Sequence, residues 1–228
     1  MLKLKQYLLG ITLAIVTLSF LSGQTFAQED FSKPDELVLK SEAVFKSFMS
    51  DPQMQWFRDN VDKAKAIFIV PRMLRGGFFI GGSGGSGALL AKSSKTGQWS
   101  YPAFYTMGSV SFGMQIGADS SEILLLVMTD KGINAMLSSE FKLGGDVAMA
   151  AGPVGATAKA QTADILAYGR SKGAYVGVSV EGALIKPRYK WNNTYYNKED
   201  VSLVDILINQ TESNSQADNL RAALPAAK

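Results

Sequence analysis

The chain of 228 residues contains no cysteine and no histidine, and its formal net charge is +3. The missing residue types exclude disulfides, thiolate metal sites and nearly all zinc sites, as well as catalysis by Ser-His-Asp or Cys-His groups. The length is sufficient for one domain with a sizeable core, which must be stable without covalent cross-links.

Residues 1–27 have the pattern of a secretory signal peptide. Two lysines precede an apolar run over residues 8–21, and small residues at positions 25 and 27 mark a cleavage site. The run is shorter than the roughly 20 residues that span a bilayer, which favours cleavage over a retained anchor. We therefore expect a periplasmic or secreted protein whose mature chain starts near Gln28, after Ala27. Because two lysines leave with the signal, 21 basic and 20 acidic residues remain.

The segment after the signal, residues 32–62, predicts two helices. Ser32 with a carboxylate at Asp35 forms a capping box, and Asp51-Pro52 ends the first helix and begins the second. Apolar residues recur at helical spacing in both, so we expect them to pack on a sheet. The alternative is a first helix lying on a membrane surface, which its acidic polar face disfavours.

Residues 64–190 change to a β-strand pattern, interrupted by a short helix over 130–138. The predicted strands are 66–70, 87–92, 98–105, 110–117, 123–128, 146–151, 154–160, 163–171 and 174–184. Glycine-rich turns, and glycines inside the strands, predict an antiparallel sheet that curves strongly and closes into a barrel or sandwich. The expected fold class is α+β, with the N-terminal helices packed against the sheet. Residues 201–208 predict a further helix or strand, and 209–228 a loose tail.

The run Gly82–Gly87 matches the dinucleotide-binding pattern G-x-G-x-x-G. A strand rather than a helix is predicted to follow, and no acidic residue lies at the distance needed to bind the ribose. A flexible turn or a close backbone approach is therefore favoured, and a weaker alternative is a lone phosphate held by amides near Arg75. The scattered carboxylates favour surface or capping positions over a hydrolase site; they are Asp119, Glu122, Asp146, Asp164 and Glu181. We expect no catalytic residues, no cofactor and no metal.

Positive charge is concentrated between residues 63 and 118, a stretch of 56 residues without any acid. Its basic residues are Lys63, Lys65, Arg72, Arg75, Lys92 and Lys95. Two interpretations stay open at this point, because such residues can be solvated strand ends or can bind anionic ligands and lipid head groups.

Aromatic and basic residues also gather over residues 186–196. Trp191, Tyr195 and Tyr196 beside lysines are typical of a membrane interface, and also of stacking on nucleic acid or sugar. Expected export argues against nucleic acid. The structural alternative is a β-hairpin that turns at Asn192-Asn193 and pairs aromatic residues across its strands.

The motifs in their order resemble the SYLF domain family over residues 34–208. The segments that carry the resemblance are 63–71, 76–87, 97–102, 113–117, 143–146, 151–155 and 172–182. The resemblance implies lipid binding, with phosphoinositide recognition in eukaryotic members and phospholipid binding in bacterial ones, and no known catalysis. It also implies an actin-regulatory role in relatives with a Src-homology-3 module. We expect no actin partner here, because an exported protein does not meet actin.

The expected function is therefore an exported lipid-binding domain, residues 28–208, that binds a phospholipid or membrane surface without catalysis. The six basic residues of the acid-free stretch would contact the head groups. The first alternative is a structural or protein-interaction module of the bacterial cell envelope, with an unknown protein partner. The second alternative is an enzyme that uses carboxylates or lysine.

Overall fold

The computed structural model describes residues 33–77, 80–112, 117–151, 158–171, 174–175 and 180–226. The predicted signal peptide and its cleavage site lie outside these residues. Within the described part of the chain, no helix has the length and the apolar character that crossing a membrane requires.

The N-terminal helices form as the sequence predicts. They are α2 (Lys33–Ser50), a short 3-10 turn η1 (Pro52–Met54) and α3 (Gln55–Val61). Asp51 separates them, because its Oδ1 accepts the Gln53 N–H at 2.9 Å and caps η1. The buried faces meet through Phe57, whose ring lies edge-on to the rings of Phe45 and Phe48 at 6.0 and 5.8 Å.

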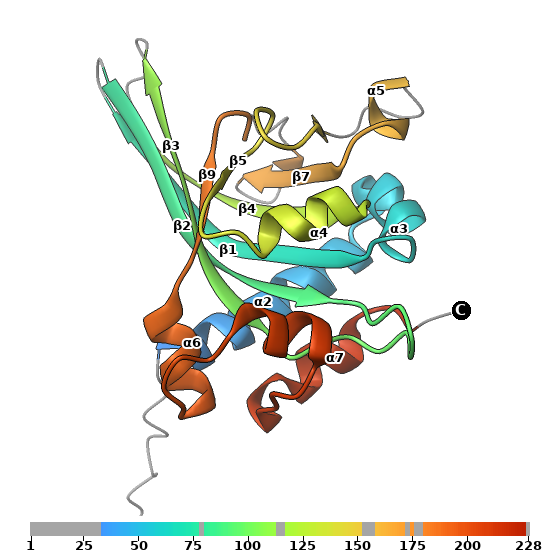
Figure 1. The fold of residues 1–228 in the computed structure, drawn as a ribbon. Helices are drawn as coiled ribbons and strands as arrows, with labels where there is room; N and C mark the ends of the chain where they lie inside the picture. Colours follow the sequence, from blue (N-terminus) through green and yellow to red (C-terminus); the bar gives the residue numbers. More distant parts are fainter. Residues whose placement is uncertain are drawn as a thin grey trace, which may run out of the picture. The chain divides into compact units, whose positions relative to one another are not determined.

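The described strands form one strongly curved sheet in the order β5-β9-β3-β2-β1-β4-β7-β6, with β8 paired to β7 (Figure 1). They are β1 (Ala66–Gly77), β2 (Ile80–Ala91), β3 (Ala103–Phe112), β4 (Gly117–Val127), β5 (Phe141–Lys142), β6 (Met149–Ala151), β7 (Ile165–Ser171), β8 (Ala174–Tyr175) and β9 (Leu184–Pro187). All pairs are antiparallel except β6 and β7, which are parallel. The expected α+β class is confirmed.

The two faces of the sheet pack against different helices. We call the face that packs against α6 (Tyr189–Tyr196) the helical face. On it, Phe104 of β3 packs against Tyr195 of α6, with ring centroids 4.9 Å apart. On the other, the Tyr105 hydroxyl donates to the Met136 carbonyl of α4 (Asp130–Met136) at 2.6 Å. Because successive residues of a strand point to opposite faces, Phe104 and Tyr105 mark the two faces of the sheet.

The glycine-rich run is strand rather than turn, because Gly82–Gly87 lies inside β2. The expected close backbone approach is found at its end. A Cβ atom on Gly87 would lie 2.5 Å from the Phe68 ring and 2.6 Å from the Ile69 carbonyl oxygen. Only glycine lets β1 and β2 pack this closely at that position.

Two predictions for the C-terminal part are wrong. Residues 189–196 form the helix α6, not a hairpin, and the helix ends at Asn197 in the left-handed conformation with φ 50°. The expected loose tail is ordered over its described residues. The tail follows η2 (Asp205–Asn209, π-helical) and contains η3 (Ser215–Ala217) and α7 (Asp218–Ala223). A four-residue helix, α5 (Ala158–Gln161), lies earlier in the chain, between β6 and β7.

The tail packs because its apolar side chains reach the core. Leu220 of α7 is fully buried. The Trp99 indole N–H donates to the Pro225 carbonyl at 2.8 Å, and the Arg221 guanidinium donates to the Trp99 carbonyl. These contacts hold α7 on the loop between β2 and β3.

Candidate functional site

Four of the six basic residues of the acid-free stretch line one cavity of about 740 Å³. Lys63 and Lys65 lead into β1, and Lys92 and Lys95 follow β2. Antiparallel pairing places the first residue of β1 opposite the last of β2, so the two lysine pairs meet at one end of the hairpin. We call this feature the lysine cavity.

The four lysines of the cavity differ in their surroundings. Lys92 donates to the Asp62 carbonyl at 2.8 Å, and its Nζ lies 4.8 Å from the centroid of the Trp99 ring. Burial lowers the pKa of Lys92, and the charge of Asp62 opposes this effect. Lys65 pairs with Asp130 at 2.5 Å, whereas Lys63 and Lys95 are exposed. Four lysines and two aspartates leave the cavity lining with a net charge of +2.

The cavity combines this positive charge with apolar and hydroxyl-bearing walls. The apolar lining residues are Ala64, Ala91, Ile133, Leu207 and Ile208, and the uncharged polar ones are Ser93, Ser94, Thr96, Gln98, Asn209 and Gln210. Gln210 holds η2 against the hairpin, since its Nε2 donates to the Ala91 carbonyl at 3.3 Å and to the Gln98 carbonyl at 3.4 Å. Such a lining can contact the anionic head and the apolar part of one amphiphilic ligand.

The other two predicted basic residues, Arg72 and Arg75, lie further along β1 and away from the lysine cavity. Arg72 lines a separate cavity of about 430 Å³ together with Arg170 and Glu122. Arg75 pairs in register with Ser83, whose hydroxyl lies 2.7 Å from that of Ser109. The structure therefore divides the acid-free stretch into two separate positive regions.

The three predicted interface aromatics belong to α6 and face the protein. Tyr195 and Tyr196 are 5% and 8% exposed, and burial raises the pKa of both hydroxyls. Trp191 is half-buried, with the Arg188 guanidinium 3.6 Å from the centroid of its ring. Tyr195 and Tyr196 are thus core residues. The spacing of Asn192, Tyr195 and Tyr196 at i, i+3 and i+4 was the signal for a helix with a buried face.

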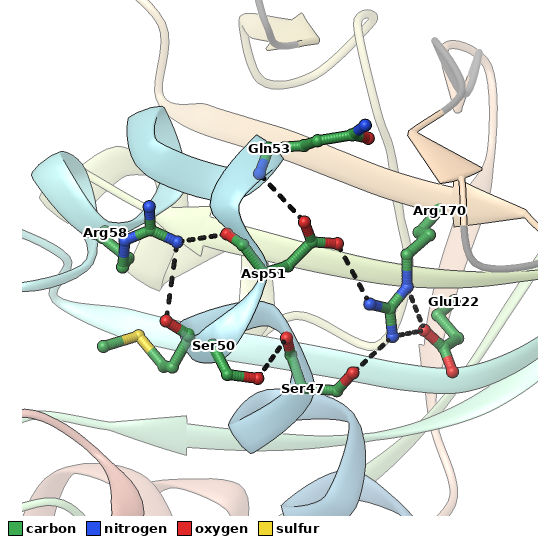
Figure 2. A network of polar contacts seen from close by, with 8 residues as sticks. Ser47, Ser50, Asp51, Gln53, Arg58, Glu122 and Arg170 are labelled. Atoms are coloured by element: carbon green, nitrogen blue, oxygen red, sulfur yellow. Dashed lines mark hydrogen bonds and ion pairs between the residues drawn. The ribbon is translucent and has the colours of Figure 1, made fainter.

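Sequence reasoning missed a charged network around Arg170, which Figure 2 shows. From β7, the Arg170 guanidinium reaches Glu122 of β4 at 2.5 Å, Asp51 at 3.3 Å and the Ser47 hydroxyl of α2 at 2.8 Å. Its side chain is 11% exposed, and it lies over the Phe48 ring at 4.9 Å. Arg170 therefore ties the N-terminal helices to the sheet.

The Ysc84 family model, described as Las17-binding protein actin regulator, matches residues 108–227, more than half of the chain. The chain belongs to this family. The SYLF resemblance is thereby confirmed. The match starts after the β1–β2 hairpin that carries the lysine cavity.

Named relatives of this Ysc84 family protein occur in animals and yeast. The human SH3 domain-containing YSC84-like protein 1 is 30% identical over 166 residues, which are 70% of this chain and 48% of the human protein. LAS seventeen-binding protein 3 of Saccharomyces cerevisiae is 34% identical over 148 residues, 60% of this chain and 31% of that protein. The chain therefore spans about half or less of the length of these relatives.

The predicted carboxylates of the Ysc84 family protein are dispersed, and those with described side chains make structural contacts. Glu122 binds Arg170, Asp146 accepts the Lys142 N–H at 2.7 Å, and Glu181 packs beside Gly144. The side chain of Asp119 lies outside the described residues. Among the side chains that the structure describes, no group of three His, Cys, Asp or Glu is placed to hold a metal ion.

Asp164 links three elements and orients the cap of α4. It accepts the Thr129 hydroxyl at 2.6 Å and the Ala148 N–H at 2.9 Å, and Thr129, not the predicted Asp130, accepts the Gly132 N–H. Burial alone would raise the pKa of Asp164. The hydrogen bonds from Thr129 and Ala148, with the Lys131 charge, outweigh burial and lower this pKa below its ordinary value.

Asp164→Asn is expected to make the protein less stable at neutral pH, with a difference from wild type that shrinks in acid. The depressed folded-state pKa means that the carboxylate stabilises the fold above the unfolded-state pKa of about 3.9. This contribution is lost as the pH falls through the folded-state value. Urea unfolding of both proteins from neutral pH down to about pH 3 measures the effect. A difference that stays constant with pH would contradict it.

Proposed function

We propose that this Ysc84 family protein is exported and binds an anionic phospholipid in the lysine cavity without catalysing a reaction. The observation that supports this is the convergence of four lysines, next to the start of β1 and the end of β2, on a cavity with apolar walls. Bulk charge gives no support, since the chain without residues 1–27 has 21 basic and 20 acidic residues. The positive charge relevant to binding is therefore local.

The lysines set the expected strength of head-group binding. A lysine contributes about 1 kcal/mol next to an anionic lipid surface, and this attraction is screened by salt. Lys63 and Lys95 are exposed, so they can turn toward a phosphate without breaking a structural contact. Lys92 contributes as well, because an anionic ligand favours the charged form of this lysine, which burial disfavours by lowering its pKa. Ile133 and the exposed Ile208 can then contact the acyl chains.

The direct test uses dihexanoyl phosphatidylglycerol below its critical micelle concentration, so that single lipids rather than membranes are bound. Titration calorimetry on residues 28–228 is expected to show binding that weakens with salt, and recovery of the lipid intact. The double variant Lys63→Ala/Lys95→Ala loses two contacts of about 1 kcal/mol each, which weakens binding about 30-fold.

The matched control is Lys131→Ala/Lys198→Ala, which removes the same charge from exposed positions outside the cavity lining. It is expected to bind like wild type. Equal affinity for the zwitterionic dihexanoyl phosphatidylcholine, or an unchanged affinity of the cavity variant, would refute lipid binding at this site. Mass spectrometry of the protein from the producing cell tests export, which predicts an N-terminus at or near Gln28.

A protein partner is the second candidate function, and the family description favours it, because it names a Las17-binding protein actin regulator. In this case the chain is an interaction module of the cell envelope. A pull-down from envelope extracts would then recover one protein in stoichiometric amount, while the purified chain carries no lipid. We expect no actin in that fraction.

A further inference from the structure

The sheet continues beyond the helices that cover its helical face, at the end of the β1–β2 hairpin opposite the lysine cavity. Figure 1 shows β1, β2 and β3 extending past α2 and α6. Among the side chains described in this region, three large apolar ones are exposed: Leu74 at 48%, Val110 at 70% and Leu184 at 41%. We call the surface that they form with Gly76, Gly82, Gly84 and Gly108 the bare sheet end.

The strand register places all of these residues on one face. Leu74 pairs with Gly84, Gly84 with Gly108, and Gly108 with Leu184, which makes one row across four strands. The next row, two residues nearer the hairpin ends, joins Gly76, Gly82 and Val110. Residues two apart in a strand share a face, so both rows lie on the same face as Phe104, the helical face. Beyond the helices this face has no cover among the described residues.

Within the described part of the chain, packing does not require glycine at the glycine positions of the bare sheet end. A Cβ atom on Gly76 or Gly84 would meet no atom within 4 Å. On the opposite face, by contrast, a Cβ on Gly85 would lie 2.6 Å from the Arg72 carbonyl oxygen. Glycine inside a strand costs about 0.5–1 kcal/mol relative to alanine, and here no internal contact compensates for this. A surface in which glycine exposes the backbone instead fits a partner that lies directly on the strands.

A positively charged row borders this apolar surface on the side of the helices. It joins Arg72, Ser86, Thr106 and Lys186 in register, and the Arg188 guanidinium donates to the Ser86 hydroxyl at 2.8 Å. Lys186 is ion-paired with Glu140. Arg72 and Arg188 have no carboxylate partner among the described residues. Because same-face rows lie about 7 Å apart, the charged row and the outer apolar row are separated by about 14 Å.

We infer that the bare sheet end is a second lipid-binding surface, which docks on an anionic bilayer. Leu74, Val110 and Leu184 enter the boundary between head groups and acyl chains, while Arg72 and Arg188 contact the phosphates. This charge pattern favours an anionic bilayer over a second copy of the chain, because the described same-face rows of β1, β2, β3 and β9 contain no acidic residue that could pair with Arg72 and Arg188 of another copy.

The position of the two surfaces has a consequence that rests on the proposed function. Lys65 directly precedes β1 and Leu74 lies nine residues further along the chain, so the lysine cavity and the bare sheet end are separated by about 30 Å along the strand. One molecule can then bind lipid at both ends and bridge two anionic membranes.

The test uses vesicles of equimolar phosphatidylcholine and phosphatidylglycerol, with vesicles of phosphatidylcholine alone as the reference. The variant Leu74→Ser/Val110→Ser changes two exposed side chains and leaves the core intact. We expect at least tenfold weaker co-sedimentation with anionic vesicles and unchanged binding of dihexanoyl phosphatidylglycerol. The matched control is Leu39→Ser/Val204→Ser, which changes two exposed apolar side chains elsewhere and should bind vesicles like wild type.

Light scattering then separates this inference from the proposed function. Wild type is expected to cluster anionic vesicles, and Lys63→Ala/Lys95→Ala to bind them without clustering. If the lysine variant alone loses vesicle binding, or if the bare-end variant retains all of it, the bare sheet end is not a membrane surface. A dimer in solution that only the bare-end variant lacks, with vesicle binding unchanged, would assign the surface to a second copy instead. If dihexanoyl phosphatidylglycerol does not bind but the bare-end variant still loses vesicle binding, the proposed function fails and this inference stands.

Discussion

Replacing Arg170 by alanine is expected to lower the free energy of unfolding by about 3 kcal/mol, the lower end of the cost of removing one partner from a buried charged network, because Glu122 is 32% exposed. Glu122 and Asp51, which both contact the Arg170 guanidinium in Figure 2, would keep their negative charges without the group that compensates them. The Ser47 hydroxyl and the Phe48 ring would also lose their contacts. Since Ser47 and Phe48 belong to α2, the loss should loosen the attachment of this helix to β4 and β7.

Urea unfolding followed by circular dichroism measures this effect. Arg170→Lys is the matched variant, because it keeps the charge but cannot bind two carboxylates and a hydroxyl at once. The free energy of unfolding of Arg170→Lys should lie between those of wild type and Arg170→Ala. If Arg170→Ala does not fold, Glu122→Gln provides a milder variant, which removes one charge from the same network. An alanine variant within about 0.5 kcal/mol of wild type, the range of ordinary surface changes, would contradict the role assigned to Arg170.

The second large effect is expected from Gly87→Ala, which should destabilise the protein by about 2–3 kcal/mol through overpacking. The added methyl would lie 2.6 Å from the Ile69 carbonyl oxygen, and a backbone atom cannot move aside as a flexible side chain can. The Phe68 ring, at 2.5 Å, would also have to shift in a core where it packs edge-on to Tyr105.

Gly84→Ala provides the control in the same strand. Its Cβ would meet open space, and alanine is less costly than glycine in a strand, so stability should stay unchanged or rise by up to about 1 kcal/mol. Thermal and urea unfolding of both variants measure the contrast. If the two substitutions destabilise the protein equally, packing requires glycine at position 84 as well, which contradicts the role of Gly84 in the bare sheet end.

Much of the fold could be predicted from local signals. Asp51-Pro52 marks the boundary between the first two helices, and the apolar run over residues 123–127 is a strand buried on both faces. The glycines of β2 were misleading, because their turn propensity is local whereas their place in a strand depends on neighbouring β1 and β3. The hairpin predicted for residues 189–196 was wrong for a related reason. Their aromatic composition favours strands, but burial of Asn192 and Tyr195 against Phe104 decides for a helix.

The candidate site was predictable only in part. The absence of acids between residues 63 and 118 singles out the lysines, and a hairpin brings 63–65 and 92–95 together. Nothing local indicates that Leu207 and Gln210 complete the cavity, or that Asp130 neutralises Lys65, because these contacts join parts of the chain far apart in sequence. The same limit applies to Arg170, whose partners lie 48 or more residues away.

The contacts of the Trp99 indole constrain the order in which the protein can fold. The Trp99 ring supports Lys92 at the lysine cavity, while its N–H is bound by the Pro225 carbonyl, 126 residues further along the chain. Contacts across such separations form late, because a long loop must close before they contribute. A growing polypeptide therefore has all its cavity lysines long before it has the support that positions them. The contact that fixes the Trp99 indole beside Lys92 can form only after Pro225 has been synthesised.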